Sequence, residues 1–249
     1  MRMRKRANLE PRMARCAALL ETEPKERRGR WLKDFPGLTA LQVELGCGKG
    51  RFTADTAERE KDALLVAIER VPDAMILAME RAQARGLTNL RFIDVDAREL
   101  TELFAPGEVA RLYINFCDPW PKSRDAKLRL TSPGFLRQYA EVLSPGGQIW
   151  FKTDNGPLFS WSKEQLTAEG WALSDVTDDL HRDGPVGVLT DYEAKFIGEG
   201  LPIHRLVATR TADTKTTAAG AVPRLRGASL VDARGYEQSM ADQPKEPSP

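Results

Sequence analysis

The sequence predicts an α/β fold built on a doubly wound, mostly parallel sheet of seven strands with helices on both faces. Two observations predict it. Short apolar runs, as expected of strands buried on both faces, alternate with longer segments of helical spacing. A glycine-rich loop also follows the first apolar run and leads into a helical segment. A length of 249 residues with 41% hydrophobic content suits one such domain with appendages.

Seven apolar runs are expected to form the strands. In chain order they are residues 41–45, 64–68, 90–95, 111–116, 148–152, 171–176 and 204–209. Helices are expected to begin near Arg51, to span 73–85 and to span 133–143, before a turn at 144–147 leads into the next strand. The last strand is expected to pair with its neighbour as a hairpin.

Two flanking segments differ in composition from this central domain, residues 36–210. Residues 1–35 are expected to form a basic arm or helix, because eleven basic residues and only four acids lie between Arg2 and Lys33. Such an arm suits contact with a polyanion, and the alternative is a solvated terminus. Residues 211–249 are small, polar and without a clear period, so they are expected to be disordered and dispensable to the chemistry.

Composition excludes several classes of protein. No apolar stretch approaches the ~20 residues that a membrane span needs, and the first residues lack the apolar region of a secretory signal, so a cytoplasmic location is expected. The three cysteines and two histidines show no spacing typical of a disulfide framework or a zinc site. Cys47 and Cys117 are expected to be small packing residues rather than nucleophiles.

The glycine-rich loop, Gly46-Cys47-Gly48-Lys49-Gly50, allows a ligand to approach the backbone closely. A dinucleotide fingerprint starting at Gly46 would need a glycine where Arg51 stands, so a pyrophosphate is not the expected ligand. Glu44 precedes the end of the strand by one residue. Its carboxylate would repel phosphates but suits a ligand that carries an ammonium and a sulfonium group.

Acidic residues also end the next two strands. Glu69 lies nineteen residues past Gly50, where an acid can accept both hydroxyls of a ribose. Asp96 ends the third strand, with Asp94 expected nearer the core, and the backbone N–H of Ala97 is placed to read an adenine edge. Acids at strand ends are also common helix caps. Three strand ends in register favour an adenosine without phosphate, so S-adenosylmethionine is the expected cofactor.

The stretch 115–131 reads Asn-Phe-Cys-Asp-Pro-Trp-Pro-Lys-Ser-Arg-Asp-Ala-Lys-Leu-Arg-Leu-Thr. It places the carboxylate of Asp118 and a rigid Pro-Trp-Pro unit before four cations, which are Lys122, Arg124, Lys127 and Arg129. A carboxylate and a flat aromatic ring beside cations suit a nucleobase attached to phosphates. The alternative is a surface turn followed by a solvated basic face.

With the glycine loop and the strand-end acids, this stretch resembles the class I methyltransferases, whose fold is Rossmann-like. Its motif 115–124, together with Phe-Lys-Thr-Asp-Asn at 151–155 and Thr-Asp-Tyr-Glu at 190–193, resembles the bacterial tRNA (guanine-N7)-methyltransferases. The resemblance covers about the first 210 residues. Two positions depart from the family's pattern: Asp125 stands where a histidine is usual, and Leu128 where a basic residue is usual. Both departures lower the positive charge that would face RNA.

The resemblance implies transfer of a methyl group from S-adenosylmethionine to N7 of the variable-loop guanosine, nucleotide forty-six, of tRNA. It implies tRNA as the partner, no membrane or metal, and a monomer or homodimer. The expected cofactor-binding residues are Glu44, Gly46, Gly48, Glu69, Asp96, Ala97 and Asp118; the expected substrate-binding residues are Lys122, Asp154, Thr190, Asp191, Tyr192 and Glu193; and the expected RNA-contacting residues are Arg124, Lys127 and Arg129.

Asp118 is the expected catalytic residue. Guanine gains positive charge as it accepts a methyl group, so a nearby carboxylate becomes more favourable in the transition state. Asp154 is an alternative source of that field. Thr190-x-x-Glu193 also matches the capping box that starts helices, and both roles can hold at once.

Two other functions fit part of the sequence. A methyltransferase of another RNA, a small molecule or a protein explains the glycine loop and Glu69 but not the two basic segments. A non-catalytic RNA-binding protein on the same fold is disfavoured by the intact set of Glu44, Asp118 and Asp154.

Overall fold

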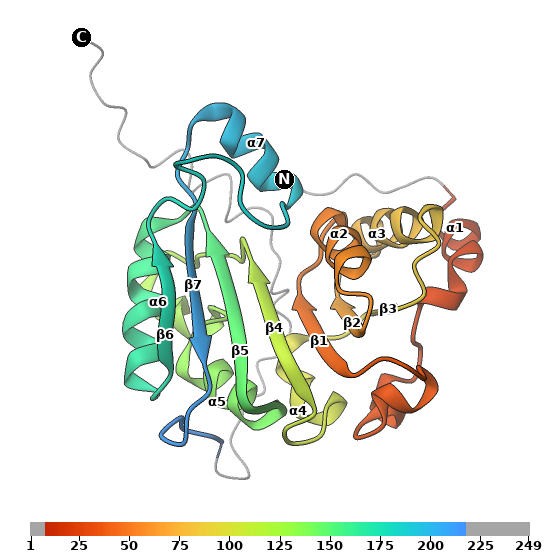
Figure 1. Cartoon of the computed structure of the whole chain (residues 1–249), viewed down its shortest axis with the longest axis horizontal. Helices are drawn as coiled ribbons and strands as arrows, with labels where there is room; N and C mark the ends of the chain where they lie inside the picture. The colour runs from red at the N-terminus through yellow and green to blue at the C-terminus, as the bar shows by residue number, and fades with distance from the viewer. Residues whose placement is uncertain (1–7, 218–249) are drawn as a thin grey trace.

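The computed structural model describes residues 8–217 and contains a seven-stranded sheet in the order β3-β2-β1-β4-β5-β7-β6 (Figure 1). The strands are β1 (Ala40–Leu45), β2 (Ala63–Ile68), β3 (Leu90–Ile93), β4 (Val109–Asn115), β5 (Leu143–Thr153), β6 (Ala172–Thr177) and β7 (His204–Thr209). The first five are parallel, whereas β7 runs antiparallel to both β5 and β6. The predicted α/β fold with a mostly parallel sheet is therefore confirmed.

Helices cover the two faces of this sheet unequally. They are α1 (Leu9–Arg15), α2 (Arg51–Arg59), α3 (Pro72–Ala84), α4 (Leu100–Leu103), α5 (Pro133–Val142), α6 (Gly156–Ala168) and α7 (Asp191–Glu199). In Figure 1, α4, α5 and α6 lie behind the sheet, α1 to α3 pack at its β1–β3 end, and α7 lies at the carboxyl ends of β4 and β5. Proline in the first turn of α3, α5 and α6 suits helix starts, because that turn has no backbone partner to lose.

Two apolar clusters, one on each face, hold the layers together. The larger joins β1, β2, β4, β5 and β7 to α4, α5 and α6, and the smaller joins α1, α2 and α3 to the β1–β3 half. On the second face of β4, β5 and β7 the described helices leave most of the surface uncovered, although Phe52 of α2 meets Tyr113 of β4 edge-on at 5.0 Å. Polar and aromatic side chains, among them Arg111, Trp150 and Arg205, lie there instead. This open half-face forms one wall of a cleft described below.

Two details of the sheet differ from expectation. Residues 144–147 belong to β5, where they form a bulge: Val109 pairs with Leu143 and Arg111 with Gln148, so the intervening residues of β5 have no one-to-one partners on β4. Strands β6 and β7 are antiparallel neighbours as expected, but the chain between them includes α7, so they are not a simple hairpin.

The described part of the expected basic arm packs against the domain. Arg12 pairs with Glu80 of α3 at 2.6 Å, and Cys16 and Leu19 are buried. Further along, Trp31 is 1% exposed and donates its indole N–H to the Leu103 carbonyl at 3.0 Å. Residues 8–35 of the expected basic arm or helix thus include the helix α1, and buried anchors and ion pairs fix them to the fold. Residues 1–7 lie outside the described residues.

The start of the expected disordered tail is also part of the fold. Thr211 and Thr214 donate from their hydroxyls to the carbonyl of Gly170, and the backbone N–H of Lys215 donates to the carbonyl of Glu169. The domain therefore extends past residue 210, and residues 218–249 lie outside the described part of the chain. Within residues 8–217, no helix is long and apolar enough to cross a membrane.

Candidate cofactor and substrate site

Five of the predicted acids gather at the carboxyl ends of the parallel strands. They are Glu44 within β1, Glu69 directly after β2, Asp96 after β3, Asp118 after β4 and Asp154 directly after β5. In an open α/β sheet this edge is where ligands bind. Several acids in one place repel one another, so the arrangement favours a ligand with positive charge.

Glu44 is the most deeply buried of these acids, at 2% exposure. Its carboxylate accepts the Thr53 hydroxyl at 2.6 Å and the Asn115 side-chain N–H at 3.4 Å. Burial raises the pKa of Glu44 to about 7, and the nearby charge of Glu69 acts in the same direction. A bound cation would favour the ionised form.

The glycine loop leaves open space where a ligand is expected. A Cβ built on Gly46 or Gly48 would meet no atom within 4 Å, and both residues have left-handed backbone, with φ of 80° and 55°. Gly50 has a different role, because its Cβ would lie 2.3 Å from the Cβ of Ala78. The first two glycines therefore border an accessible space, whereas the third allows α2 to pack against α3.

Glu69 is held beside this loop. One carboxylate oxygen accepts the backbone N–H of Gly48 at 2.9 Å and the other that of Val71 at 2.8 Å. Burial raises the pKa of Glu69, although these hydrogen bonds oppose the shift. An ionised carboxylate has about four acceptor positions, so acceptor capacity remains for a ribose hydroxyl.

Asp96 combines a structural role with the expected one. It caps the short 3-10 helix Ala97–Glu99 through the Arg98 N–H, and its carboxylate pairs with the side chains of Arg98 at 2.5 Å and Arg70 at 2.8 Å. Burial opposes ionisation of Asp96, but the hydrogen bonds from Arg98 outweigh it and lower the pKa. Ala97 is buried beside it. The expected order of depth is reversed, since Asp96 is buried and Asp94 is exposed.

The turn that carries Asp118 has strained backbone on both sides. Phe116 and Trp120 have φ of 53° and 43°, a left-handed conformation that costs a non-glycine residue about 1–3 kcal/mol. Arg129 stabilises the turn by donating to the carbonyls of Pro119 at 2.9 Å and Trp120 at 3.0 Å. Its guanidinium also lies 4.4 Å from the ring centre of Trp161.

Arg129 was predicted to contact RNA, and this stays a prediction; in the structure its guanidinium bonds the Asp118 turn and lies over Trp161. Lys122, Arg124 and Lys127 are exposed on or beside the 3-10 helix Ser123–Leu128, as a phosphate contact requires. Asp125, which departs from the family's pattern, lies 3.8 Å from Arg124. It therefore reduces the positive charge of this helix.

Tyr192 lies opposite the Asp118 turn, at the start of α7. Its ring is tilted against Phe116 at 6.0 Å and stacked on Phe196 at 6.4 Å, while the residue remains 51% exposed. Partial burial raises the pKa of Tyr192, and the charges of Asp118, Asp154 and Glu69 add to the shift. The structure thus brings the predicted Asp118, Asp154 and Tyr192 into one neighbourhood. Asp191 pairs with Arg81 at 3.5 Å.

Glu193 was predicted to bind the substrate, but its side chain is buried. It is 0% exposed and accepts Lys152 at 2.8 Å and the backbone N–H of Thr190 at 2.7 Å, which completes the capping box. Val186 N–H donates to His181 Nδ1, so His181 Nε2 carries the proton and donates to Glu193 at 3.2 Å. Direct contact of Glu193 with a substrate is therefore contradicted. We call Lys152, His181 and Glu193 the buried hub.

Sequence reasoning missed Thr53, Asn115 and the two other members of the buried hub. Asn115 and Lys152 have partners 71 and 41 residues away, and even Thr53 and His181 bond residues nine and 12 positions away, so no recognised motif marks them. Asn115 had one signal, since it is polar at the end of an apolar strand. The cysteines are as expected: burial raises the pKa of Cys117 to about 12 and that of Cys47 well above its usual value, so both stay protonated thiols.

Comparison with known proteins places this geometry in a family. The Methyltransf_4 family model, described as "Putative methyltransferase", matches residues 39–206. The tRNA (guanine-N(7)-)-methyltransferase of Lachnoclostridium phytofermentans is 42% identical over 76% of this chain and 89% of its own length. Those of Geobacillus thermodenitrificans and Bacillus subtilis are 39% and 37% identical, over 84% and 82% of this chain and 98% and 97% of theirs.

The chain belongs to the tRNA (guanine-N(7)-)-methyltransferase family. Solved structures agree on the fold. The 16S rRNA methyltransferase KamB has a TM-score of 0.57 at 19% identity, covering 73% of this chain and 92% of its own. A 16S rRNA (adenine(1408)-N(1))-methyltransferase from Catenulisporales acidiphilia gives 0.53 at 19% identity, covering 81% and 95%. The chain is thus a methyltransferase of the class I fold, as predicted.

Proposed function

We propose that this methyltransferase transfers a methyl group from S-adenosylmethionine to N7 of the variable-loop guanosine of tRNA, nucleotide forty-six. Family membership supports the substrate, because the relatives named above are tRNA (guanine-N(7)-)-methyltransferases. The observation that carries the chemistry is that Asp118 and Asp154 follow the neighbouring strands β4 and β5, while Tyr192 packs against Phe116, two residues before Asp118.

The residues present fit the cofactor. Its ribose would be held by Glu69, its adenine by Asp96 and Ala97, and its amino-acid portion by Glu44 near the open space at Gly46 and Gly48. Asn115 Oδ1 is buried and accepts no hydrogen bond from the described residues, so it offers an acceptor beside Glu44 for an ammonium group. When bound, S-adenosylmethionine supplies an electrophilic methyl group on its sulfonium.

The protein's part in the reaction is placement and charge. Guanine N7 has an in-plane lone pair and no proton, so no general base is needed to create the nucleophile. Asp118 and Asp154 would accept the N1–H and N2–H donors of guanine and orient the base. Their negative charge favours the positive charge that the base acquires. Tyr192, half-exposed above them, offers a ring against which the base can stack.

A guanine in folded tRNA must leave its stack to reach this edge, at a cost of a few kcal/mol. The exposed cations Lys122, Arg124 and Lys127 would offset that cost through phosphate contacts. They lie directly after the Asp118 turn, so a backbone held there brings its base close to the carboxylates.

The test incubates the full chain with radiolabelled S-adenosylmethionine and unmodified tRNA, then maps the product by borohydride and aniline cleavage. We expect cleavage at one variable-loop guanosine, and no incorporation with Asp118→Ala despite retained tRNA binding. Incorporation without cleavage would indicate another methylated atom, and no incorporation into tRNA would refute the proposal.

A further inference from the structure

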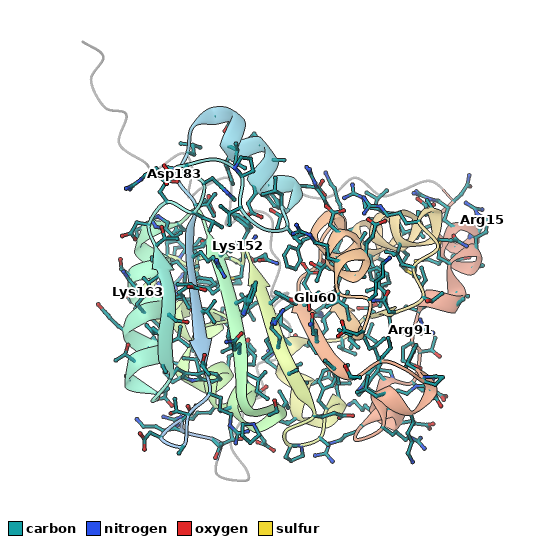
Figure 2. All side chains as sticks on the ribbon, in the orientation of Figure 1. Arg15, Glu60, Arg91, Lys152, Lys163 and Asp183 are labelled. Atoms are coloured by element: carbon teal, nitrogen blue, oxygen red, sulfur yellow. The ribbon has the colours of Figure 1, made fainter. Side chains whose placement is uncertain are left out.

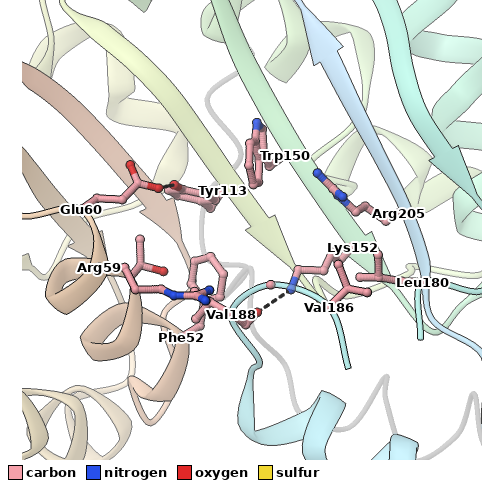
Figure 3. A pocket seen from close by; sticks show the side chains of 12 residues that line it. Phe52, Arg59, Glu60, Tyr113, Trp150, Lys152, Leu180, Val186, Val188 and Arg205 are labelled. Atoms are coloured by element: carbon pink, nitrogen blue, oxygen red, sulfur yellow. Dashed lines mark hydrogen bonds between the residues drawn. The ribbon is translucent and has the colours of Figure 1, made fainter. Parts of the chain in front are cut away.

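A cleft lies on the open face of β4, β5 and β7, apart from the residues assigned to the cofactor (Figure 3). Its volume is about 300 Å³. Tyr113, Trp150 and Arg205 line the sheet side, Phe52 and Arg59 of α2 line one wall, and residues 186–188 form the roof. None of Glu44, Glu69, Asp96 or Asp118 belongs to its lining. We call it the sheet-face cleft.

The charge of the sheet-face cleft is positive. Its lining contains three cations, Arg59, Lys152 and Arg205, and one acid, Glu60. Glu60 pairs with Arg111 at 2.9 Å, Lys152 with Glu193 at 2.8 Å and Arg205 with Asp175 at 3.4 Å, so Arg59 supplies the excess positive charge. Figure 2 shows Lys152 near the carboxyl end of β5 and Glu60 toward the β1–β3 half of the sheet, and Figure 3 shows them on opposite sides of the cleft. An anionic ligand is the one that this lining complements.

Flat groups are layered on the same face. The guanidiniums of Arg111 and Arg205 lie 4.4 and 5.0 Å from the ring centre of Trp150, and Tyr113 meets that ring edge-on at 5.9 Å. Guanidinium planes and aromatic rings are the surfaces on which unstacked bases lie in RNA complexes. Positive charge with planar groups fits a nucleotide better than a simple anion.

The segment that forms the roof of the cleft continues along the chain into α7, which carries Tyr192. Lys152 Nζ donates to the Val188 carbonyl at 2.9 Å, the contact drawn in Figure 3, and two residues later Thr190 caps the helix that carries Tyr192. On the floor, Asp154 follows Lys152 by two residues. A strand of RNA that places its base at Tyr192 can therefore continue into the cleft.

We propose that the sheet-face cleft binds a nucleotide of the tRNA that neighbours the methylated guanosine, with its base against this layer of planar groups and its phosphate on Arg59 and Arg205. This inference rests on the proposed function. The basic segment of residues 1–7 is a poor occupant, since Arg2, Arg4, Lys5 and Arg6 have the same sign of charge as the cleft.

The test compares the full chain with the Arg59→Gln/Arg205→Gln double variant in tRNA binding by fluorescence anisotropy over a range of salt. Arg59 is exposed, so the single Arg59→Gln variant guards against misfolding. Lys61→Gln is the matched control, because it removes the same charge two residues away but outside the lining. We expect about tenfold weaker binding and a salt slope smaller by about 1–2 for the double variant, and wild-type values for Lys61→Gln.

Binding of S-adenosylmethionine alone, measured by calorimetry, should be unchanged in all three variants. Wild-type tRNA affinity and salt slope in the double variant would overturn the cleft proposal even if the wild type methylates N7. Equal losses in Lys61→Gln would also overturn it, and so would altered self-association with unchanged tRNA binding. Absence of N7 methylation by the wild type would refute the proposed function separately, because the binding assay requires no chemistry.

Discussion

Burial of the Glu44 carboxyl should make the stability of the fold and the affinity for the cofactor depend on pH in opposite directions. Burial raises its pKa from 4.5 to about 7, so the folded chain holds this proton more tightly than the unfolded chain at intermediate pH. Because the native state then binds more protons, stability falls as pH rises between these two values. We expect Glu44 to contribute a loss of about 3 kcal/mol from pH 4.5 to pH 7.

Urea unfolding at several pH values should show that loss, with Glu44→Gln as the control. The variant keeps the shape of the side chain and lacks the ionisation, so its stability should depend less on pH over this range. Identical pH profiles for the two proteins would mean that Glu44 ionises in the folded chain as it does in water.

Affinity for a cationic cofactor should change with pH in the other direction. Only the ionised form of Glu44 attracts an ammonium or sulfonium group, and its ionised fraction increases through pH 7. We expect S-adenosylmethionine to bind about tenfold more tightly at pH 8 than at pH 6. Calorimetry without tRNA measures this, and Glu44→Gln should bind weakly at both pH values.

Arg129 and Arg124 lie on one short segment but should differ in the property they affect. Arg129 holds the carbonyls of the strained Asp118 turn, whereas Arg124 is exposed. We expect Arg129→Gln to lower kcat by at least tenfold with a nearly unchanged salt slope of tRNA binding. Arg124→Gln, its matched control, should lower the salt slope by about 1 and leave kcat near wild type. A reversed pattern would support the interpretation of Arg129 as a phosphate ligand.

At the scale of elements, the buried hub connects β5, the segment before α7, and α7 itself. Lys152 is 6% exposed, and burial lowers its pKa, although the Glu193 charge opposes that shift. Removing one partner leaves the other charge buried without compensation, which costs about 3–5 kcal/mol. The position of Tyr192 relative to Asp118 therefore depends on a buried ion pair between β5 and α7.

We expect Glu193→Gln to lower the free energy of unfolding by about 3 kcal/mol, and the double variant Lys152→Met/Glu193→Gln to recover much of that loss. A double-mutant cycle in urea measures the coupling. If Glu193 acts only by positioning α7, the double variant should also regain affinity for tRNA. Additive effects of the two substitutions would show that the ion pair does not hold the helix.

The sequence predicts the elements well because strands and helices are encoded by local patterns. All seven apolar runs became strands, and the helices expected near Arg51, at 73–85 and at 133–143 lie within a residue or so of their predicted bounds. The orientation of individual side chains is set by distant contacts. Glu193 turns inward toward Lys152, forty-one residues away, and Arg129 toward Trp161. A motif identifies such residues without revealing which way they face.

The same limit applies at the scale of the whole molecule, where residues 1–35 are expected to form a basic arm or helix and residues 211–249 a disordered tail. Their basic or polar composition predicts solvated segments, yet single anchors fix them to the domain. Trp31 does so near the amino terminus, and the hydroxyls of Thr211 and Thr214 do so near the end of the described residues. One tryptophan or two threonines change the average composition of a segment too little for the anchor to be recognised from the sequence.

The segment 211–217 should therefore contribute to stability. Besides the two threonines, Lys215 donates through its backbone to Glu169 and through its side chain to Ala168 at 2.9 Å, and Thr217 donates to Glu141. At about 1 kcal/mol for each hydrogen bond, a chain that ends at Arg210 should be less stable than one that ends at Thr217 by about 2–4 kcal/mol. Thermal unfolding of the two truncated chains measures the difference. Equal melting temperatures would place the domain boundary at residue 210 after all.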